Sequence, residues 1–291
     1  MKLIVEPDGG MPPIVNAIKQ ARKSIDILIF RLDRAEIARA LCAAVSRGVV
    51  VRALTAHTNR GGEKSLRKLE LQLLEGGVTV SRTADDLVRY HGKMMILDSR
   101  ILHVYGFNLT ALDIGKSRSF GVITRNRRLV LEAAKLFEAD FNRQPYSPSY
   151  ERFVVSPENA RERLAQFIRG AKRQLLIYDP QLTDDAMLQI LQARVKAGVD
   201  VRVIGKVEAK WEVKGEKLGR RLHVRTIVRD RSRAFIGSQS LRKLELEKRR
   251  EVGVIVDDAK VVRQLAAVFE EDWATTEAGR KLVKKELKAA S

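Results

Sequence analysis

Residues 90–99 read YHGKMMILDS, and a related stretch, LHVRTIVRDR, occupies residues 222–231. Further segments match in the same order along the chain, which is the pattern of an internal duplication. The matching pairs are VVVRAL (49–54) with VDVRVI (199–204), SFGVIT (119–124) with EVGVIV (251–256), and FEADF (137–141) with FEEDW (269–273). The chain therefore contains two copies of one unit.

One insertion distinguishes the two copies. Matching residues are 150 positions apart at the strand 49–54 but 132 apart from residue 90 onward. The segment EKSLRKLELQLLEGG (63–77) accounts for the difference, and its apolar spacing predicts an additional helix. Elsewhere both copies alternate helical stretches with short strands rich in Val and Ile, which indicates α/β units with a largely buried sheet.

The segment QPYSPSY (144–150) interrupts both periodicities with two Pro and two Ser. We therefore predict two homologous α/β halves, residues 1–146 and 147–291. Two copies of one fold usually pack about a pseudo-twofold axis, so equivalent residues can meet at the interface.

The charge of the chain is strongly positive, +19 from 55 Lys and Arg against 36 Asp and Glu. The densest stretch, residues 220–250, has 11 basic and 3 acidic side chains. Such a field attracts nucleic acid or an anionic lipid surface. The single Cys, Cys42, fits a reducing compartment. Because neither a signal peptide nor a transmembrane segment is evident, we predict a cytoplasmic protein whose contact with membranes is peripheral.

Two of the four His begin the same pattern, H-x-[KR]-x4-D. The residues are His91, Lys93 and Asp98 in the first copy, and His223, Arg225 and Asp230 in the second. On a strand, residues i and i+2 point to the same face, so each His lies beside a cation. A cation neutralises phosphoryl oxygens and a neutral imidazole attacks phosphorus, which together make a phosphate site with a nucleophile. Each Asp comes where its strand ends, and we expect it to fix the local turn.

These motifs, with YGFNLT after the first and GSQSLR after the second, resemble the HKD motifs of the phospholipase D superfamily. The resemblance spans nearly the whole chain. It implies two phospholipase D-like α/β/α sandwich halves packed as a pseudo-dimer, so that a monomer carries the complete site. It also implies a phosphodiesterase that uses neither metal nor cofactor. One motif His forms a phosphohistidine, while the other protonates the leaving oxygen and then activates water or an alcohol.

The further elements of the family are a Gly-Ser, an Asn two residues after that Ser, and a carboxylate 28 residues after the His. The second copy has Gly237, Ser238 and Glu251, but Arg225 replaces the Lys and Ser240 replaces the Asn. The first copy has Lys93 and Asn108, but Tyr105 and Gly106 stand at the Gly-Ser, and Ser119 replaces the carboxylate. Between them, the two motifs supply every role once.

The family pattern favours His91 as nucleophile and His223 as general acid and base, with Glu251 orienting His223. The phosphoryl oxygens would then be held by Lys93, Arg225 and Asn108. An opposing argument is that a carboxylate on one imidazole nitrogen raises the basicity of the other, which would make His223 the stronger nucleophile. The sequence leaves both assignments open.

Three functions are compatible with these motifs. A doubled motif in one chain resembles the lipid enzymes and cardiolipin synthases more than the single-motif nucleases, so the first interpretation is hydrolysis or transfer of phosphatidyl groups. The second is a nuclease or other nucleic-acid phosphodiesterase, which the charge suits equally, although 16 aromatic residues offer few platforms for base stacking. The third is a degenerate module that binds phosphate or nucleic acid without cleaving it.

Overall fold

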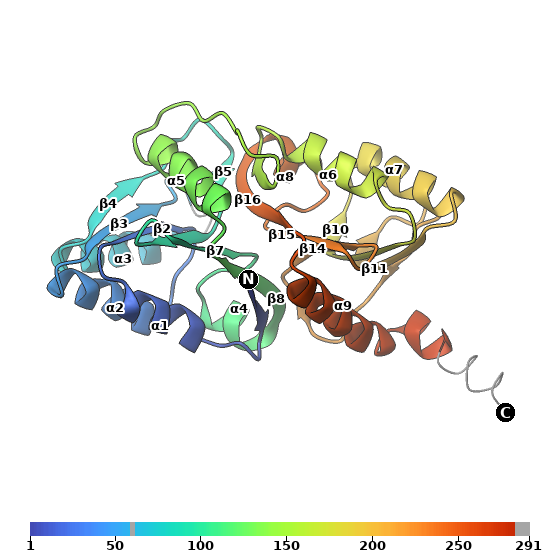
Figure 1. Ribbon diagram of the computed structural model, residues 1–291, viewed down its shortest axis with the longest axis horizontal. Coiled ribbons are helices and arrows are strands. Elements are labelled where there is room, and N and C mark those ends of the chain that lie inside the picture. The colour runs from blue at the N-terminus through green and yellow to red at the C-terminus, as the bar shows by residue number, and fades with distance from the viewer. Residues whose placement is uncertain (59–61, 283–291) are drawn as a thin grey trace.

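The computed structural model describes residues 1–58 and 62–282, and these residues form two eight-stranded sheets in neighbouring halves (Figure 1). The main strand order of the first sheet is β1-β8-β7-β6-β2-β3-β4. The first half contains β1 (Lys2–Glu6), α1 (Pro12–Gln20), β2 (Ser24–Ile29), α2 (Ala35–Ser46), β3 (Val50–Thr55), α3 (Glu63–Glu75), β4 (Thr79–Arg82), β5 (Arg89–Tyr90), β6 (Met94–Leu97), β7 (Ile101–Tyr105), α4 (Ala111–Lys116), β8 (Ser117–Thr124) and α5 (Arg127–Phe141).

The second sheet repeats this plan with the main order β12-β11-β10-β14-β15-β16-β5, and β9 also pairs with β16. The second half contains β9 (Phe153–Ser156), α6 (Ala160–Arg169), β10 (Gln174–Leu182), α7 (Asp185–Lys196), β11 (Asp200–Val207), β12 (Gly215–Glu216), β13 (Arg221–Leu222), β14 (Arg225–Arg229), β15 (Arg233–Gly237), α8 (Lys243–Glu247), β16 (Arg249–Val256) and α9 (Ala259–Ala274). The segment between α5 and β9 contains the boundary that we propose between residues 146 and 147.

Each half donates one short strand to the sheet of the other half. Strand β5 belongs to the first half by sequence but pairs in parallel with β16, with Arg89 opposite Arg249 and Tyr90 opposite Arg250. Strand β13 of the second half pairs in parallel with β8 of the first. Because β5 and β13 directly precede the two motif His, this exchange brings the motifs of both halves to the interface.

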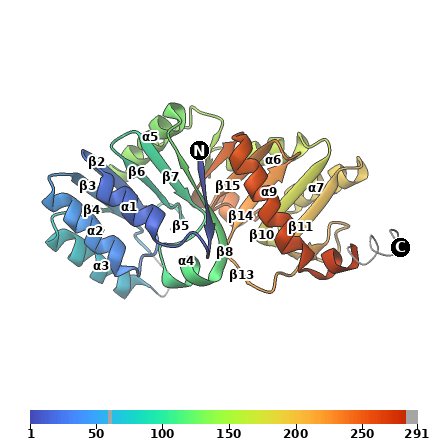
Figure 2. The same cartoon turned by 60° about the horizontal axis from the view of Figure 1, so that its bottom comes forward.

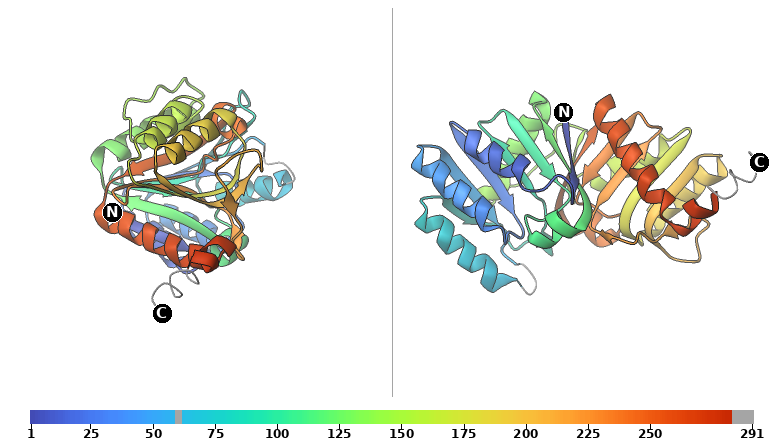
Figure 3. Two further views of the ribbon diagram at one scale, coloured as in Figure 1. Left: turned by 90° about the vertical axis from the view of Figure 1, so that its right-hand side faces the viewer. Right: turned by 90° about the horizontal axis from the view of Figure 1, so that it is seen from below.

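Helices cover both faces of each sheet. In the first half, α1, α2 and α3 pack on one face, and α5 packs on the other. In the second half, α6 and α7 pack on one face and α9 on the other. Figures 2 and 3 show that α1, α2 and α9 lie on the same side of the molecule. The faces under α5 and α9 share one apolar core, in which the rings of Phe120 and Tyr178 meet edge-on at 5.4 Å.

The structure confirms the α/β pseudo-dimer and the additional helix, which is α3. It corrects the predicted motif strands, because β6 begins at Met94 and β14 at Arg225, so that both His precede their strands. Among the described residues, no helix has the length and apolar character needed to cross a membrane.

Candidate active site

The Asp of each motif fixes a turn at the far end of its strand. Asp98 has a φ of 52° and accepts hydrogen bonds from the backbone N–H groups of residues 22–24, at 2.6 to 3.1 Å. Asp230 has the same φ and accepts from residues 172–174, at 2.7 to 3.2 Å. Both residues therefore serve the turns, as their position predicts, and lie at the opposite ends of the strands from the His.

His91 is held between a carboxylate and an ammonium group. Its Nδ1 lies 2.9 and 3.0 Å from the two carboxylate oxygens of Glu251, and its Nε2 lies 3.0 Å from Nζ of Lys93. The ring of Phe30 meets the imidazole edge-on at 4.5 Å. The contact between His91 and Lys93 is the one that their spacing predicts. The site is buried, with Lys93 only 2% exposed.

The partner of Glu251 corrects the sequence prediction, which paired this carboxylate with His223. The reason is the strand exchange. Because β5 lies against β16, the backbone N–H of His91 donates to the carbonyl of Arg250 at 2.7 Å, and the next residue is Glu251. The carboxylate of the second half thus orients the imidazole of the first.

His223 has a carboxylate partner that the sequence analysis missed, Asp113 in the short helix α4. Its Nδ1 lies 2.6 Å from Oδ2 of Asp113. The same Oδ2 accepts from the backbone N–H of Asn108 at 3.0 Å and from its side-chain amide at 2.7 Å. Ser119, which occupies the family position of the carboxylate, instead donates to the backbone carbonyl of His223 at 2.6 Å.

The structure therefore modifies the predicted function of Asn108. One of its amide donors is used to hold Asp113, so part of its function is structural. Within the described residues, its Oδ1 is buried and has no hydrogen-bond partner. Its contact with a phosphoryl group stays a prediction.

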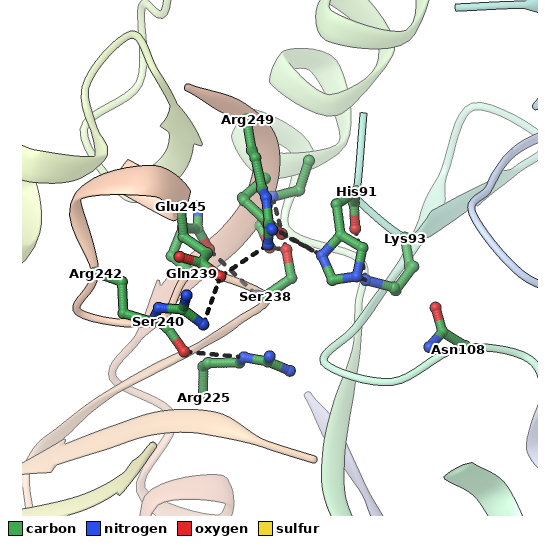
Figure 4. A network of polar contacts seen from close by, with 12 residues as sticks. His91, Lys93, Asn108, Arg225, Ser238, Gln239, Ser240, Arg242, Glu245 and Arg249 are labelled. Carbon is green, nitrogen blue, oxygen red and sulfur yellow. Dashed lines mark hydrogen bonds and ion pairs between the residues drawn. The ribbon is translucent and has the colours of Figure 1, made fainter. Parts of the chain in front are cut away.

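The second half surrounds the site with guanidinium groups. Arg225 donates from Nε to the hydroxyl of Ser240 at 3.3 Å. Arg249 and Arg242 both contact the buried carboxylate of Glu245, at 2.8 and 3.5 Å. Figure 4 shows these groups facing His91 and Lys93 across the interface. Sequence reasoning singled out only Arg225 of these three cations, because Arg242 and Arg249 lie outside the repeated pattern.

The glycines of the motif region are explained by close backbone contacts. A Cβ at Gly237 would lie 2.7 Å from Cα of Gly253, so position 237 tolerates no side chain. The next residue, Ser238, accepts a hydrogen bond from the N–H of Val252 and contacts Glu251. The equivalent of Ser238 in the first half is Gly106, where a Cβ would lie 3.0 Å from the carbonyl of Gly237.

Burial dominates the ionisation of the site. It lowers the pKa of His91 well below its usual value, and the charges of Lys93 and Arg225 add to this effect. Burial also lowers the pKa of His223 to about 4, although Asp113 opposes the shift. The pKa of Lys93 falls to about 7, again through burial and against the influence of Glu251. Both imidazoles are therefore neutral at pH 7 in the free protein.

The two carboxylates differ in their ionisation. Burial raises the pKa of Glu251, and the positive charges of Lys93 and Arg225 limit the rise. Burial also opposes the ionisation of Asp113, but its contacts with His223, Asn108 and Arg221 together hold its pKa well below the usual range. His223 also lowers the pKa of His91 through space, which places the two imidazoles within one electrostatic site.

Comparison with known proteins identifies the family. The family model described as the PLD-like domain of cardiolipin synthase matches residues 14–143 and 205–273. These segments make up more than half of the chain and contain both motifs, so the chain belongs to the phospholipase D superfamily.

Among curated proteins, the chain is similar to cardiolipin synthase 1 of Bacillus cereus, with 24% identity over 340 residues. The alignment covers 94% of this chain and 66% of that relative. The chain thus spans somewhat less than two thirds of the length of the relative.

Two solved structures share the fold at low sequence identity. Polyphosphate kinase from Porphyromonas gingivalis has a TM-score of 0.76 and 19% identity, over 92% of this chain and 49% of that one. Phosphatidylserine synthase from Haemophilus influenzae has a TM-score of 0.68 and 11% identity, over 96% and 90%. At these identities the likeness shows the arrangement of two halves and not the reaction.

Proposed function

We propose that this chain is a phosphodiesterase of the phospholipase D type that hydrolyses or transfers phosphatidyl groups of phospholipids through a phosphohistidine. The observation that carries the proposal is the crossed pair of imidazole–carboxylate contacts, His91 with Glu251 and His223 with Asp113. A carboxylate at Nδ1 fixes the tautomer and leaves Nε2 for chemistry.

In the first step, Nε2 of neutral His91 attacks phosphorus, and the bond from phosphorus to the leaving oxygen breaks. Lys93 moves from Nε2 to a non-bridging oxygen, where Arg225 also binds. Protonated His223 gives its proton to the leaving oxygen. Its pKa is low in the free protein, but a bound phosphodiester anion favours the imidazolium form. In the second step, neutral His223 takes a proton from water or an alcohol, which attacks phosphorus and releases His91.

The assignment of His91 as nucleophile is now favoured over the reverse. The argument for His223 depended on Glu251 as its partner, yet Glu251 contacts His91 and each imidazole has its own carboxylate. Because the carboxylate of Glu251 accepts a hydrogen bond, neutral His91 carries its proton on Nδ1, so Nε2 is unprotonated and lies next to Lys93, the proposed phosphate ligand. These are the conditions that a nucleophilic imidazole needs.

A lipid substrate is supported by the family match and by the name of the curated relative, cardiolipin synthase 1. The basic surface then supplies peripheral attraction to an anionic membrane. Nucleic acid is the alternative substrate, because it is also a polyanion. An assay that offers both substrates distinguishes the two possibilities.

The experiment compares release of products from phosphatidylglycerol vesicles with cleavage of single- and double-stranded DNA, with EDTA present throughout. We expect lipid products only, and none from the His91→Ala variant. A second arm quenches the reaction with a labelled phosphodiester and maps the label, which we expect on the peptide that contains His91. DNA cleavage without lipid turnover would transfer the proposal to nucleic acid. Absence of any product or label would favour a module that binds phosphate without catalysis.

A further inference from the structure

The second motif departs from its family at two positions, and the structure brings these positions into contact. Arg225 stands where the family has Lys, and Ser240 stands where it has Asn. The Nε of Arg225 donates to the Ser240 hydroxyl at 3.3 Å. Because Arg is longer than Lys and Ser is shorter than Asn, the small residue leaves space for the long one.

A buried carboxylate lies behind this contact. The Ser240 hydroxyl donates to Oδ1 of Asp179 at 2.7 Å, and the backbone N–H of Leu241 donates to Oδ2 at 2.7 Å. Asp179 is 2% exposed, and burial raises its pKa to about 6, although the positive charge of Arg225 acts against this rise. A buried carboxylate without a nearby cation is costly, so Arg225 and Asp179 each reduce the cost of burying the other.

In the first half, an apolar residue stands at the position equivalent to Asp179. Leu28 and Tyr178 are equivalent residues, since they pair with Met94 and Thr226 in the matching registers of the two sheets. The equivalent of Asp179 is therefore the next residue, Ile29, which is buried and apolar. In that half the Asn at the equivalent of Ser240 donates to Asp113, and the Lys contacts its own His. The carboxylate thus accompanies the Arg-Ser pair.

We propose that Arg225, Ser240 and Asp179 form one unit, in which Ser240 and Asp179 are positioning residues that aim the guanidinium of Arg225 at the phosphoryl group. The proposal rests on the binding of phosphate by Arg225 in the proposed function. With Nε held by Ser240, the far end of the guanidinium is directed to the substrate. Within the described residues, its Nη1 is buried and has no hydrogen-bond partner.

Arg225 in the second half therefore binds phosphate as a geometric clamp, that is, with a fixed geometry. Lys93 in the first half acts as a point charge. A planar guanidinium binds two oxygens of one phosphoryl group along fixed directions, whereas an ammonium attracts them without such a constraint. Substitution of Arg225 by Lys alone therefore preserves the charge but loses the clamp. Substitution of Ser240 by Asn alone crowds the guanidinium. Both changes together recreate the Lys and Asn of the family motif.

A double-mutant cycle tests this unit with Arg225→Lys, Ser240→Asn and the double variant. Three quantities are measured at fixed pH: the Kd for inorganic phosphate, and kcat and KM with phosphatidylglycerol. We expect each single change to weaken phosphate binding and raise KM about tenfold, and the double variant to recover to within about threefold of the unmodified protein. The control is Arg229→Lys. Arg229 lies in the same strand and donates to the carbonyl of Phe167, so the effects of Arg229→Lys and Ser240→Asn on these quantities should be additive.

A second variant, Asp179→Asn, keeps the shape of the side chain and removes its charge. We expect it to raise KM about fivefold in the unmodified background and to have no further effect in the double variant, because Lys no longer depends on the carboxylate. A merely structural carboxylate would lower the melting temperature in both backgrounds without changing KM.

The outcomes separate this inference from the proposed function. Additive losses in the cycle, with lipid turnover present, would overturn the unit and leave the function intact. Coupled phosphate binding without turnover of any lipid would overturn the function and leave the unit intact. Equal effects of Asp179→Asn on KM in the two backgrounds would remove Asp179 from the unit.

Discussion

The two imidazoles receive the same support from different parts of the two halves. His91 is oriented by Glu251, which lies in strand β16 at the position predicted from the family motif. His223 is oriented by Asp113, which lies in the short helix α4, six residues before the equivalent position. The duplication therefore preserved the contact and not the residue that makes it. A motif position can be lost when a nearby group reaches the same atom.

The shift of the orienting carboxylate from position 119 to Asp113 is accompanied by a change at a second position, the equivalent of Ser238. In the second half, Ser238 contacts Glu251 beneath the imidazole of the other half. In the first half, both equivalents have changed, to Gly106 and Ser119. A Cβ at Gly106 would lie 3.0 Å from the carbonyl of Gly237, and Ser119 bonds the backbone of His223. Once Asp113 supports the imidazole, neither the Ser nor the carboxylate is required there.

Removal of either imidazole gives the largest expected effect. His91→Ala and His223→Ala should each lower kcat on phosphatidylglycerol at least about a thousandfold, because one supplies the nucleophile and the other the proton. Groups that act as a unit are not additive, so the double variant should be little worse than the worse single one. Half of the activity surviving in each variant would show two independent sites and would contradict the pseudo-dimer mechanism.

The sequence predicted the fold and the two imidazoles because both depend on local pattern. Short runs rich in Val and Ile predicted the strands, and the spacing of 132 residues paired the motifs. The contacts across the interface could not be predicted, since they depend on β5 and β13. Each of these strands has two residues, which is too short for a recognisable pattern. The assignment of Glu251 to the wrong His follows from this.

The sequence contains one indication that Asp113 orients His223. The first half has no carboxylate at Ser119, although an orienting carboxylate is expected there. Asp113 is the only acidic residue between Asn108 and Ser119. A search for a substitute acid would therefore have reached it. The coupling of Arg225 with Ser240 was not accessible in this way, because the carboxylate behind them is contributed by a distant strand.

The second prediction tests whether the position of the carboxylate matters. Asp113→Asn should lower kcat about a hundredfold, because the amide does not stabilise the imidazolium form of His223. Adding Ser119→Glu returns a carboxylate to the family position, and we expect kcat to rise about tenfold above that of Asp113→Asn alone. The control is Ser119→Gln in the Asp113→Asn background, which has the same size without the charge. Equal kcat values for the Glu and Gln variants would contradict the substitution model.

The third prediction concerns Lys93, the cation that differs from Arg225 in its ability to titrate. Burial lowers its pKa to about 7, so the ammonium is lost as pH rises from 6 to 8. In the free protein both imidazoles are already neutral in this range, and a phosphodiester keeps one negative charge. KM for a short-chain phosphatidylglycerol should therefore rise about tenfold between pH 6 and 8. Lys93→Arg keeps its charge and should give a much shallower profile, in which only the protonation of His223 in the complex remains, whatever its kcat. Parallel profiles would assign the pH dependence to another group.

The smallest expected effects come from a feature that the two halves share residue for residue, the motif carboxylates Asp98 and Asp230. Each residue adopts a positive φ and binds three backbone N–H groups of a neighbouring loop, away from the imidazoles. Asp98→Ala and Asp230→Ala should each reduce the free energy of unfolding by about 1–3 kcal/mol, measured by urea denaturation, with kcat and KM unchanged. Asn tolerates positive φ and still accepts hydrogen bonds, so Asp98→Asn should cost less.

These two carboxylates also predict a dependence of stability on pH. Burial opposes their ionisation, but the backbone N–H groups around each carboxylate outweigh it and lower the pKa of both below the usual value of 3.8. A carboxyl group whose pKa is lower in the folded protein stabilises the fold above its unfolded pKa, and this contribution is lost as pH falls through the folded value. The Asn variants should therefore lose less stability than the unmodified protein between pH 5 and about pH 2. Unequal losses for the two Ala variants, or a loss of kcat in either, would show that the halves differ at these turns as they do at the carboxylates that orient the imidazoles.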